Sequence, residues 1–185
     1  MVNHNNVIFI NGLSIPTYLS KTRYVWNDDL WKDYNRKYLS SPIAISNLDF
    51  QNKLESLIKI VNSVENPVVI GQSLGAWWAA NLACTKEVKL NKLILMTPLV
   101  DARDVPFFNI SKGINPLEKP PFIVGPDKVL VCFAKNDIIC PPYTNAYNLL
   151  RHFNGIQYHL NGGHFFQKDH TSCLKFMQDW MDFDI

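Results

Sequence analysis

Short apolar runs alternate with longer stretches of helical period along most of this chain. The apolar runs predict six buried strands, at residues 7–10, 42–46, 68–70, 92–97, 128–134 and 156–160. Continuous apolar strands that alternate with helices are typical of a parallel sheet covered on both faces. We therefore expect an α/β fold, a three-layer sandwich with a mostly or fully parallel six-stranded sheet and helices on both faces.

Helical periodicity fills most of the stretches between these strands. The strongest signal is an apolar stripe from Phe50 to Val64, spaced like the core-facing side of an amphipathic helix. Asn47 or Asp49 can cap this helix, and Pro67 ends it. We expect the other helices at residues 24–38, 74–84, 141–153 and 167–182.

One long connection does not fit this alternation. Residues 98–127 are rich in proline and show no clear periodicity. Long connections in compact domains tend to be lids or binding loops, or else poorly ordered, so this segment is a candidate for a short lid. A chain of 185 residues suits a single domain, and we expect residues 1–185 to form one.

Composition and charge exclude several classes of protein. The chain is 47% hydrophobic and only 18% charged, which is typical of a globular protein rather than a disordered one. The net charge is +2 without a cluster of Lys and Arg, so we expect no nucleic-acid partner. The four cysteines form no CxxC pair, which argues against zinc and disulfide frameworks. We see neither a signal peptide nor the ~20 apolar residues that cross a bilayer, so we expect a cytoplasmic protein.

The most informative motif is GQSLG at residues 71–75, which has the form G-x-S-x-G and lies between a predicted strand and a predicted helix. At such a turn, glycines let the strand and the helix approach closely, and the serine hydroxyl projects above the carboxyl edge of the sheet. N–H groups at the start of the helix can stabilise a developing negative charge. Ser73 is therefore a candidate nucleophile, and the alternative is a turn serine without a reactive role.

His164 and Asp137 could supply the partners that a reactive serine needs. A serine is a poor nucleophile unless a base takes its proton, and that base needs an orienting carboxylate. His164 follows the sixth predicted strand on a glycine-rich loop, and Asp137 follows the fifth. Both lie just beyond the carboxyl ends of strands, where sites form in open α/β sheets. Asp101 and Asp104, after the fourth strand, are the alternatives for the acid, and we expect no metal site.

Three motifs together make the sequence resemble the α/β-hydrolase superfamily: GQSLG at 71–75, KNDIICPP at 135–142 and GGHF at 163–166. The resemblance covers nearly the whole chain. The two leading strands and the large helical cap of many members are missing, so the chain is similar to compact members with a six-stranded core. The resemblance implies no cofactor.

The resemblance also implies a role for each candidate residue. Ser73 would be the nucleophile, His164 the general base and acid, and Asp137 the group that holds the imidazole. The N–H of Leu74 would bind the oxyanion together with a second N–H from the loop after the first strand. We assign that second donor to Leu13.

Other residues near the proposed site are candidates for substrate binding. They are Gly12, which is also the alternative second donor, and Gln72, Phe107, Phe108 and Phe165. Trp77 and Trp78 follow the proposed nucleophile, but consecutive residues of a helix cannot share one face. We expect at least one of the two tryptophans to pack in the core.

These observations predict a serine hydrolase that cleaves a carboxylic ester or thioester through an acyl-enzyme intermediate. A short proline-rich loop in place of a cap favours small or short-chain acyl substrates. One alternative is a non-catalytic or weakly active interaction protein on the same fold, because fold does not determine function. The other is an acyltransferase or carbon–carbon hydrolase that uses the same three residues. The expected partner is a small-molecule ester or thioester substrate, and the sequence does not tell whether the chain has a protein partner.

Overall fold

A computed structural model describes residues 6–12, 31–44, 46–101, 115–165 and 170–183 of the chain. Six strands in these residues form one sheet in the order β2-β1-β3-β4-β5-β6, and every neighbouring pair is parallel. The strands are β1 (Asn6–Ile10), β2 (Asn35–Leu39), β3 (Pro67–Gln72), β4 (Lys92–Met96), β5 (Val129–Ala134) and β6 (Ile156–Leu160). The predicted six-stranded parallel sheet is confirmed.

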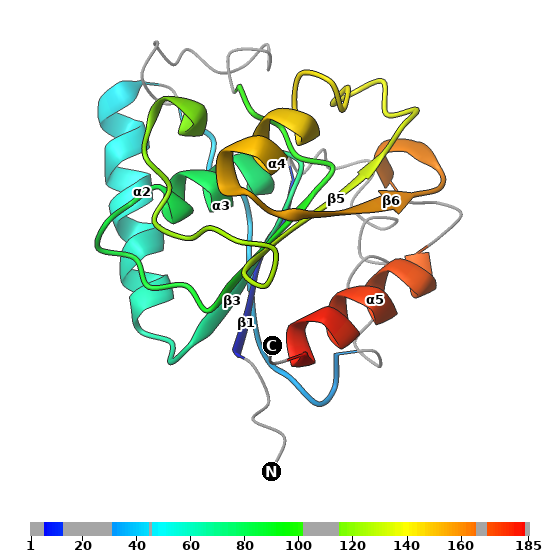
Figure 1. The fold of residues 1–185 in the computed structure, drawn as a ribbon. Helices are drawn as coiled ribbons and strands as arrows, with labels where there is room; N and C mark the ends of the chain where they lie inside the picture. Colours follow the sequence, from blue (N-terminus) through cyan, green and yellow to red (C-terminus); the bar gives the residue numbers. More distant parts are fainter. Residues whose placement is uncertain (1–5, 13–30, 45, 102–114, 166–169, 184–185) are drawn as a thin grey trace.

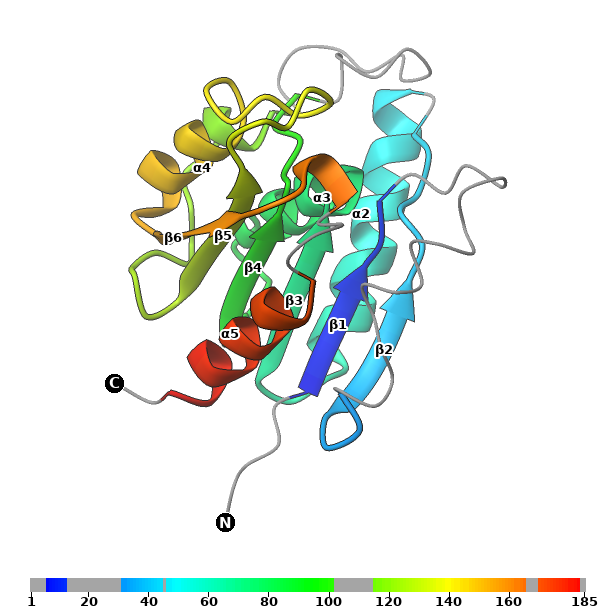
Figure 2. The same ribbon diagram turned by 90° about the vertical axis from the view of Figure 1, so that its right-hand side faces the viewer.

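Helices cover both faces of this sheet. The described helices are α2 (Asn47–Asn62), α3 (Leu74–Ala83), α4 (Ala146–Phe153) and α5 (His170–Asp182), with the short 3-10 helices η3 (Pro116–Glu118) and η4 (Gly163–Phe165). Figure 1 shows α2, α3 and α4 on one face and α5 on the opposite face. Figure 2, turned by 90°, shows α5 in front of the sheet with α2 and α3 behind it. The chain is therefore the expected three-layer sandwich.

Each face of the sheet contributes to its own apolar core, because successive side chains of a strand point to opposite faces. Val69 of β3 packs in the cluster that contains α2, α3 and α4. Its neighbour Ile70 packs in the second cluster, which contains α5. Trp77 and Trp78 are both at most 1% exposed and belong to the first cluster, so the expected core packing holds for both tryptophans.

Two predicted elements on one side of the sheet are wrong. Residues 35–38, which we expected in a helix, belong to β2, and residues 42–44 and 46 form no strand. β2 pairs only with β1 at the edge of the sheet, and its residues are exposed or half-buried, so it lacks the apolar run that marks a buried strand. The apolar run at 42–46 instead leads into α2. Residues 24–30 of the predicted helix lie outside the described residues.

The ends of two helices also differ from the prediction. The N-cap of α2 is Ser46, whose hydroxyl accepts a hydrogen bond from the N–H of Asp49, rather than Asn47 or Asp49. α4 begins at Ala146, and residues 142–145 form turns that precede it. Among the described helices, none is both long enough and apolar enough to cross a membrane.

Candidate active site

Ser73 stands at a sharp turn between β3 and α3. Its φ is 53° and its ψ is −116°, a backbone conformation that non-glycine residues rarely adopt. The turn depends on close packing at the two glycines of the motif. A Cβ on Gly75 would collide with the carbonyl oxygen of Ile10 in β1, and a Cβ on Gly71 would collide with the backbone of Gly75. The strained turn therefore holds the serine hydroxyl at the carboxyl edge of the sheet.

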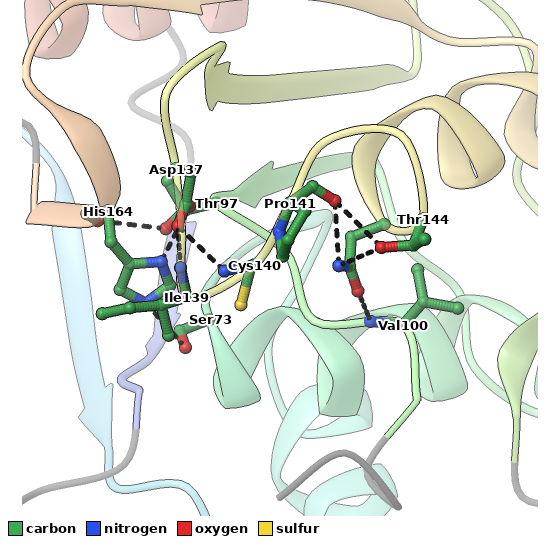
Figure 3. A network of polar contacts seen from close by, with 10 residues as sticks. Ser73, Thr97, Val100, Asp137, Ile139, Cys140, Pro141, Thr144 and His164 are labelled. Atoms are coloured by element: carbon green, nitrogen blue, oxygen red, sulfur yellow. Dashed lines mark hydrogen bonds and ion pairs between the residues drawn. The ribbon is translucent and has the colours of Figure 1, made fainter.

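Ser73, His164 and Asp137 are joined by a chain of hydrogen bonds (Figure 3). The distance from His164 Nε2 to Ser73 Oγ is 3.0 Å, and the distance from His164 Nδ1 to Asp137 Oδ2 is 2.8 Å. An ionised carboxylate can only accept, so Nδ1 carries the proton of the neutral imidazole. Nε2 is then left to accept the hydroxyl proton of Ser73. The structure thus brings together the three residues that the sequence singled out.

The carboxylate of Asp137 is held in place from its other side. Its Oδ1 accepts hydrogen bonds from the backbone N–H groups of Ile139 at 2.9 Å and Cys140 at 2.8 Å. Asp137 is 4% exposed and His164 is 7% exposed, whereas Ser73 is half-buried. Asp137 and His164 are therefore shielded from solvent, and Ser73 is the most exposed residue of the three.

The loop that carries His164 is tied to β4. Thr97, the residue after β4, donates a hydrogen bond from Oγ1 to the carbonyl oxygen of His164 at 3.3 Å. Thr97 itself has a φ of 37°, which is unusual for a β-branched residue. In the loop, Gly163 has a φ of 72°, which favours glycine. Thr97 was missed in the sequence, although it follows a strand directly, as Ser73 does.

Leu74 and Gly12, two of the candidate oxyanion donors, are close to Ser73. The first N–H groups of a helix have no partner within that helix, and Leu74 is the first residue of α3. Gly12, after β1, lies beside the serine, since a Cβ at that position would be 3.2 Å from Ser73 Cβ. Leu13, the expected second donor, lies outside the described residues. The oxyanion hole itself stays a prediction.

The remaining predicted site residues are less informative. Gln72 is 4% exposed at the end of β3. Phe165 is part of η4, but its side chain is not among those described. Phe107 and Phe108 lie outside the described residues, as does Asp104. Asp101, the other alternative for the acid, is half-buried, and the carboxylate that binds His164 Nδ1 is that of Asp137.

The predicted lid, residues 98–127, is described in two parts. In the first part, the N–H of Leu99 bonds to the carbonyl oxygen of Ser73 at 3.3 Å. In the second part, residues 115–122 lie away from Ser73. The N–H of Phe122 bonds to the carbonyl oxygen of Ala83 at 2.9 Å, and Cys84 Sγ lies 3.5 Å from the carbonyl oxygen of Pro116. Ala83 and Cys84 mark the C-terminal end of α3, the end opposite to Ser73. Residues 102–114 lie outside the described residues, so the short lid stays a prediction. In the described ranges, no group of three or more His, Cys, Asp and Glu side chains could hold a metal ion.

No protein-family model and no curated protein matches the sequence. Solved structures do match the fold, with similarities over nearly the whole chain. An esterase domain from Rhodothermus marinus has a TM-score of 0.67 at 14% identity and covers 96% of this chain and 86% of its own. A fluorophosphonate-binding serine hydrolase of Staphylococcus aureus has a TM-score of 0.65 at 15% identity, and the match covers 100% of this chain and 86% of the hydrolase. An alpha/beta hydrolase enzyme from a lagoon-sediment metagenome of Mar Chica, Morocco, has a TM-score of 0.64 at 15% identity, and the match covers 96% of this chain and 90% of that enzyme.

Proposed function

Because the chain has the α/β-hydrolase fold, we propose that it is a serine hydrolase that cleaves a carboxylic ester or thioester, with Ser73, His164 and Asp137 as its catalytic triad. The observation that carries the proposal is the unbroken chain of hydrogen bonds from Ser73 Oγ through the imidazole to Asp137. An esterase and a serine hydrolase among the similar structures support it further.

In the first half of the reaction, the Ser73 hydroxyl attacks the carbonyl carbon of the substrate. The proton passes from Oγ to His164 Nε2, which lies 3.0 Å away. The carboxylate of Asp137 stabilises the resulting imidazolium through Nδ1. The N–H of Leu74, with that of Leu13 or Gly12, holds the negative charge of the tetrahedral intermediate. The intermediate then expels the alcohol or thiol, which takes the proton from Nε2, and Ser73 is left acylated.

In the second half, water replaces the alcohol or thiol. Nε2 accepts a proton from the water as its oxygen attacks the acyl carbon. The second intermediate collapses, and the Ser73 oxygen recovers its proton from the imidazole as the carboxylic acid leaves. The enzyme returns to its starting state without any further reactant.

The connection between β4 and β5 favours small or short-chain acyl groups. It is too short for a large helical cap, and residues 115–122 within it pack at the far end of α3. Ser73 is half-buried rather than enclosed. A small ester can therefore reach the hydroxyl without the opening of a domain.

Hydrolysis of p-nitrophenyl acetate and of a short acyl thioester tests this function. We expect the wild-type chain to hydrolyse at least one of them and Ser73→Ala to lose roughly 10⁴-fold or more in kcat, because the nucleophile and its proton are removed together. Ser172→Ala, an exposed serine of α5, is the matched control. Equal rates for wild type and Ser73→Ala would refute the proposal.

A further inference from the structure

Asn145 is a buried amide between the loops that follow β4 and β5. Its side chain is 4% exposed and makes three hydrogen bonds. Oδ1 accepts from the N–H of Val100 at 2.8 Å, and Nδ2 donates to the carbonyl oxygen of Pro141 at 3.0 Å and to Thr144 Oγ1 at 3.1 Å. These three partners are labelled in Figure 3. One backbone donor and one backbone acceptor determine which way the amide points, because an N–H must meet the oxygen and a C=O must meet the nitrogen.

The side chain of Asn145 does not serve the helix that it precedes. Asn145 is the N-cap of α4, a position where asparagine ordinarily accepts a hydrogen bond from the first turn. Here it makes no side-chain cap hydrogen bond. The amide instead joins two loops that are separate in the sequence. A local helix preference therefore does not explain an asparagine at this position.

Both loops that Asn145 joins lead directly to the candidate active site. Next to Val100, the N–H of Leu99 bonds to the carbonyl oxygen of Ser73 at 3.3 Å. Next to Pro141, the N–H of Cys140 bonds to Asp137 Oδ1 at 2.8 Å. The amide thus closes a ring of contacts that runs from the backbone of Ser73 to the carboxylate of Asp137 and returns through His164 to Ser73 Oγ.

We propose that Asn145 is a positioning residue that sets the distance between the nucleophile turn and the acid loop, an inference that rests on the proposed function. The amide itself touches none of the three reacting side chains. It acts by linking Val100 to Pro141, so that Ser73 and Asp137 stay in register with the imidazole between them. Displacement of a reacting group by about 1 Å can cost roughly 100-fold in rate. Loss of the link therefore slows proton transfer from Ser73 and has a smaller effect on the affinity for the substrate.

Two variants test whether Asn145 links the two loops or only provides a hydrogen-bond acceptor for the buried N–H of Val100. Asn145→Leu removes both ends of the link. Asn145→Asp keeps an acceptor for Val100 but has no donor for the carbonyl oxygen of Pro141. If the hydrogen bond from the N–H of Val100 were all that the site needs, Asn145→Asp would behave like the wild type. The matched control is Asn81→Leu, because Asn81 is also a fully buried asparagine, and its amide bonds to the carbonyl oxygen of Trp77 within α3 and to Lys119.

The first measurement is the second-order rate of labelling by a fluorophosphonate probe, recorded over a range of pH and compared at the plateau of each variant's own pH profile. We expect Asn145→Leu and Asn145→Asp to label about tenfold or more slowly than the wild type. For a short p-nitrophenyl ester, the loss should lie in kcat and not in KM. Asn81→Leu should label at the wild-type rate even where its melting temperature is lower.

The second measurement does not require activity. The Nδ1 proton of His164, bonded to Asp137, should give a downfield proton NMR signal that broadens or moves upfield in both Asn145 variants and stays in place in Asn81→Leu. Unlabelled wild-type protein would refute the proposed hydrolase function, and this signal alone would then decide the role of Asn145. Wild-type labelling rates with an unshifted signal in the two Asn145 variants would overturn the positioning role.

Discussion

His164 Nδ1 lies 2.8 Å from Asp137 Oδ2, although 27 residues separate the two in the sequence. Each follows a different strand, β6 and β5, and these strands are neighbours in the sheet. The other oxygen of the carboxylate accepts two backbone N–H groups, which prevents it from turning away from the ring. The acid is therefore oriented before any substrate arrives.

This arrangement makes Asp137→Asn a sharp test of how the imidazole works. The amide oxygen must face the N–H groups of Ile139 and Cys140, so the NH₂ group faces His164 Nδ1. The imidazole then carries its proton on Nε2 and cannot accept one from Ser73. We expect kcat for a short p-nitrophenyl ester to fall about 10⁴-fold, with little change in melting temperature. Asp179→Asn, an exposed residue of α5, serves as the control, and a fall of less than tenfold in Asp137→Asn would contradict this role.

The hydroxyl of Thr97 gives a second prediction, about the loop that carries the imidazole. Thr97→Val keeps the branched shape and the backbone strain but leaves the carbonyl oxygen of His164 without this donor. We expect the free energy of unfolding to fall by about 1–2 kcal/mol, and kcat to fall with it. Thr97→Ser keeps the hydroxyl and should retain kcat. Urea unfolding and ester hydrolysis check both, and equal kcat in the valine and serine variants would show that the hydroxyl does not hold the loop.

Much of the fold could be read from the sequence because most strands are buried on both faces. β3, β4 and β5 are buried along their whole length, so each is a short apolar run between helices of clear period. The candidate active site could be predicted for a related reason. Ser73 and Asp137 come one and three residues after such runs, and parallel strands bring those positions to one edge of the sheet.

The wrong predictions concern parts of the chain that lack a buried apolar run or whose role depends on contacts between distant segments. β2 has the sequence NRKYL and is not buried, since only β1 flanks it. Periodicity cannot recognise such a strand, and the apolar residues at 42–46 wrongly predict one beside it. Asn145 could not be found either, because its position before a helix suggests an ordinary cap. Only the fold shows that its amide joins two loops at the site.

Cys84 leads to a prediction about stability at alkaline pH. Burial raises the pKa of its thiol to about 12, while the thiol of an unfolded chain has a pKa near 8.5. Between about pH 9 and pH 12, the unfolded chain loses this proton and the folded chain keeps it. The contribution of the thiol to stability is therefore complete below about pH 8.5 and is lost as pH rises, at about 1.4 kcal/mol per pH unit.

Replacement of this thiol should make the free energy of unfolding fall less steeply as pH rises above about 9. Serine does not ionise in this range, so Cys84→Ser should lose stability less steeply than the wild type between pH 9 and pH 10, by about 1 kcal/mol per pH unit. Urea unfolding at pH 8, 9 and 10 measures both slopes. Tyr34 and Cys132, whose pKa values are also raised by burial, contribute equally to both proteins. Parallel slopes for the two proteins would contradict the assignment.

The central claim is that Ser73 becomes acylated, and trapping the acyl-enzyme tests it most directly. Wild-type protein is mixed with p-nitrophenyl acetate, quenched in acid within the first turnover and digested for mass spectrometry of the peptide that contains Ser73. We expect a burst of p-nitrophenol of about one equivalent per chain, and one acetyl group on Ser73 that is absent from Ser73→Ala. An unmodified Ser73 in protein that turns over the ester, or an acetyl group on another residue, would contradict the account.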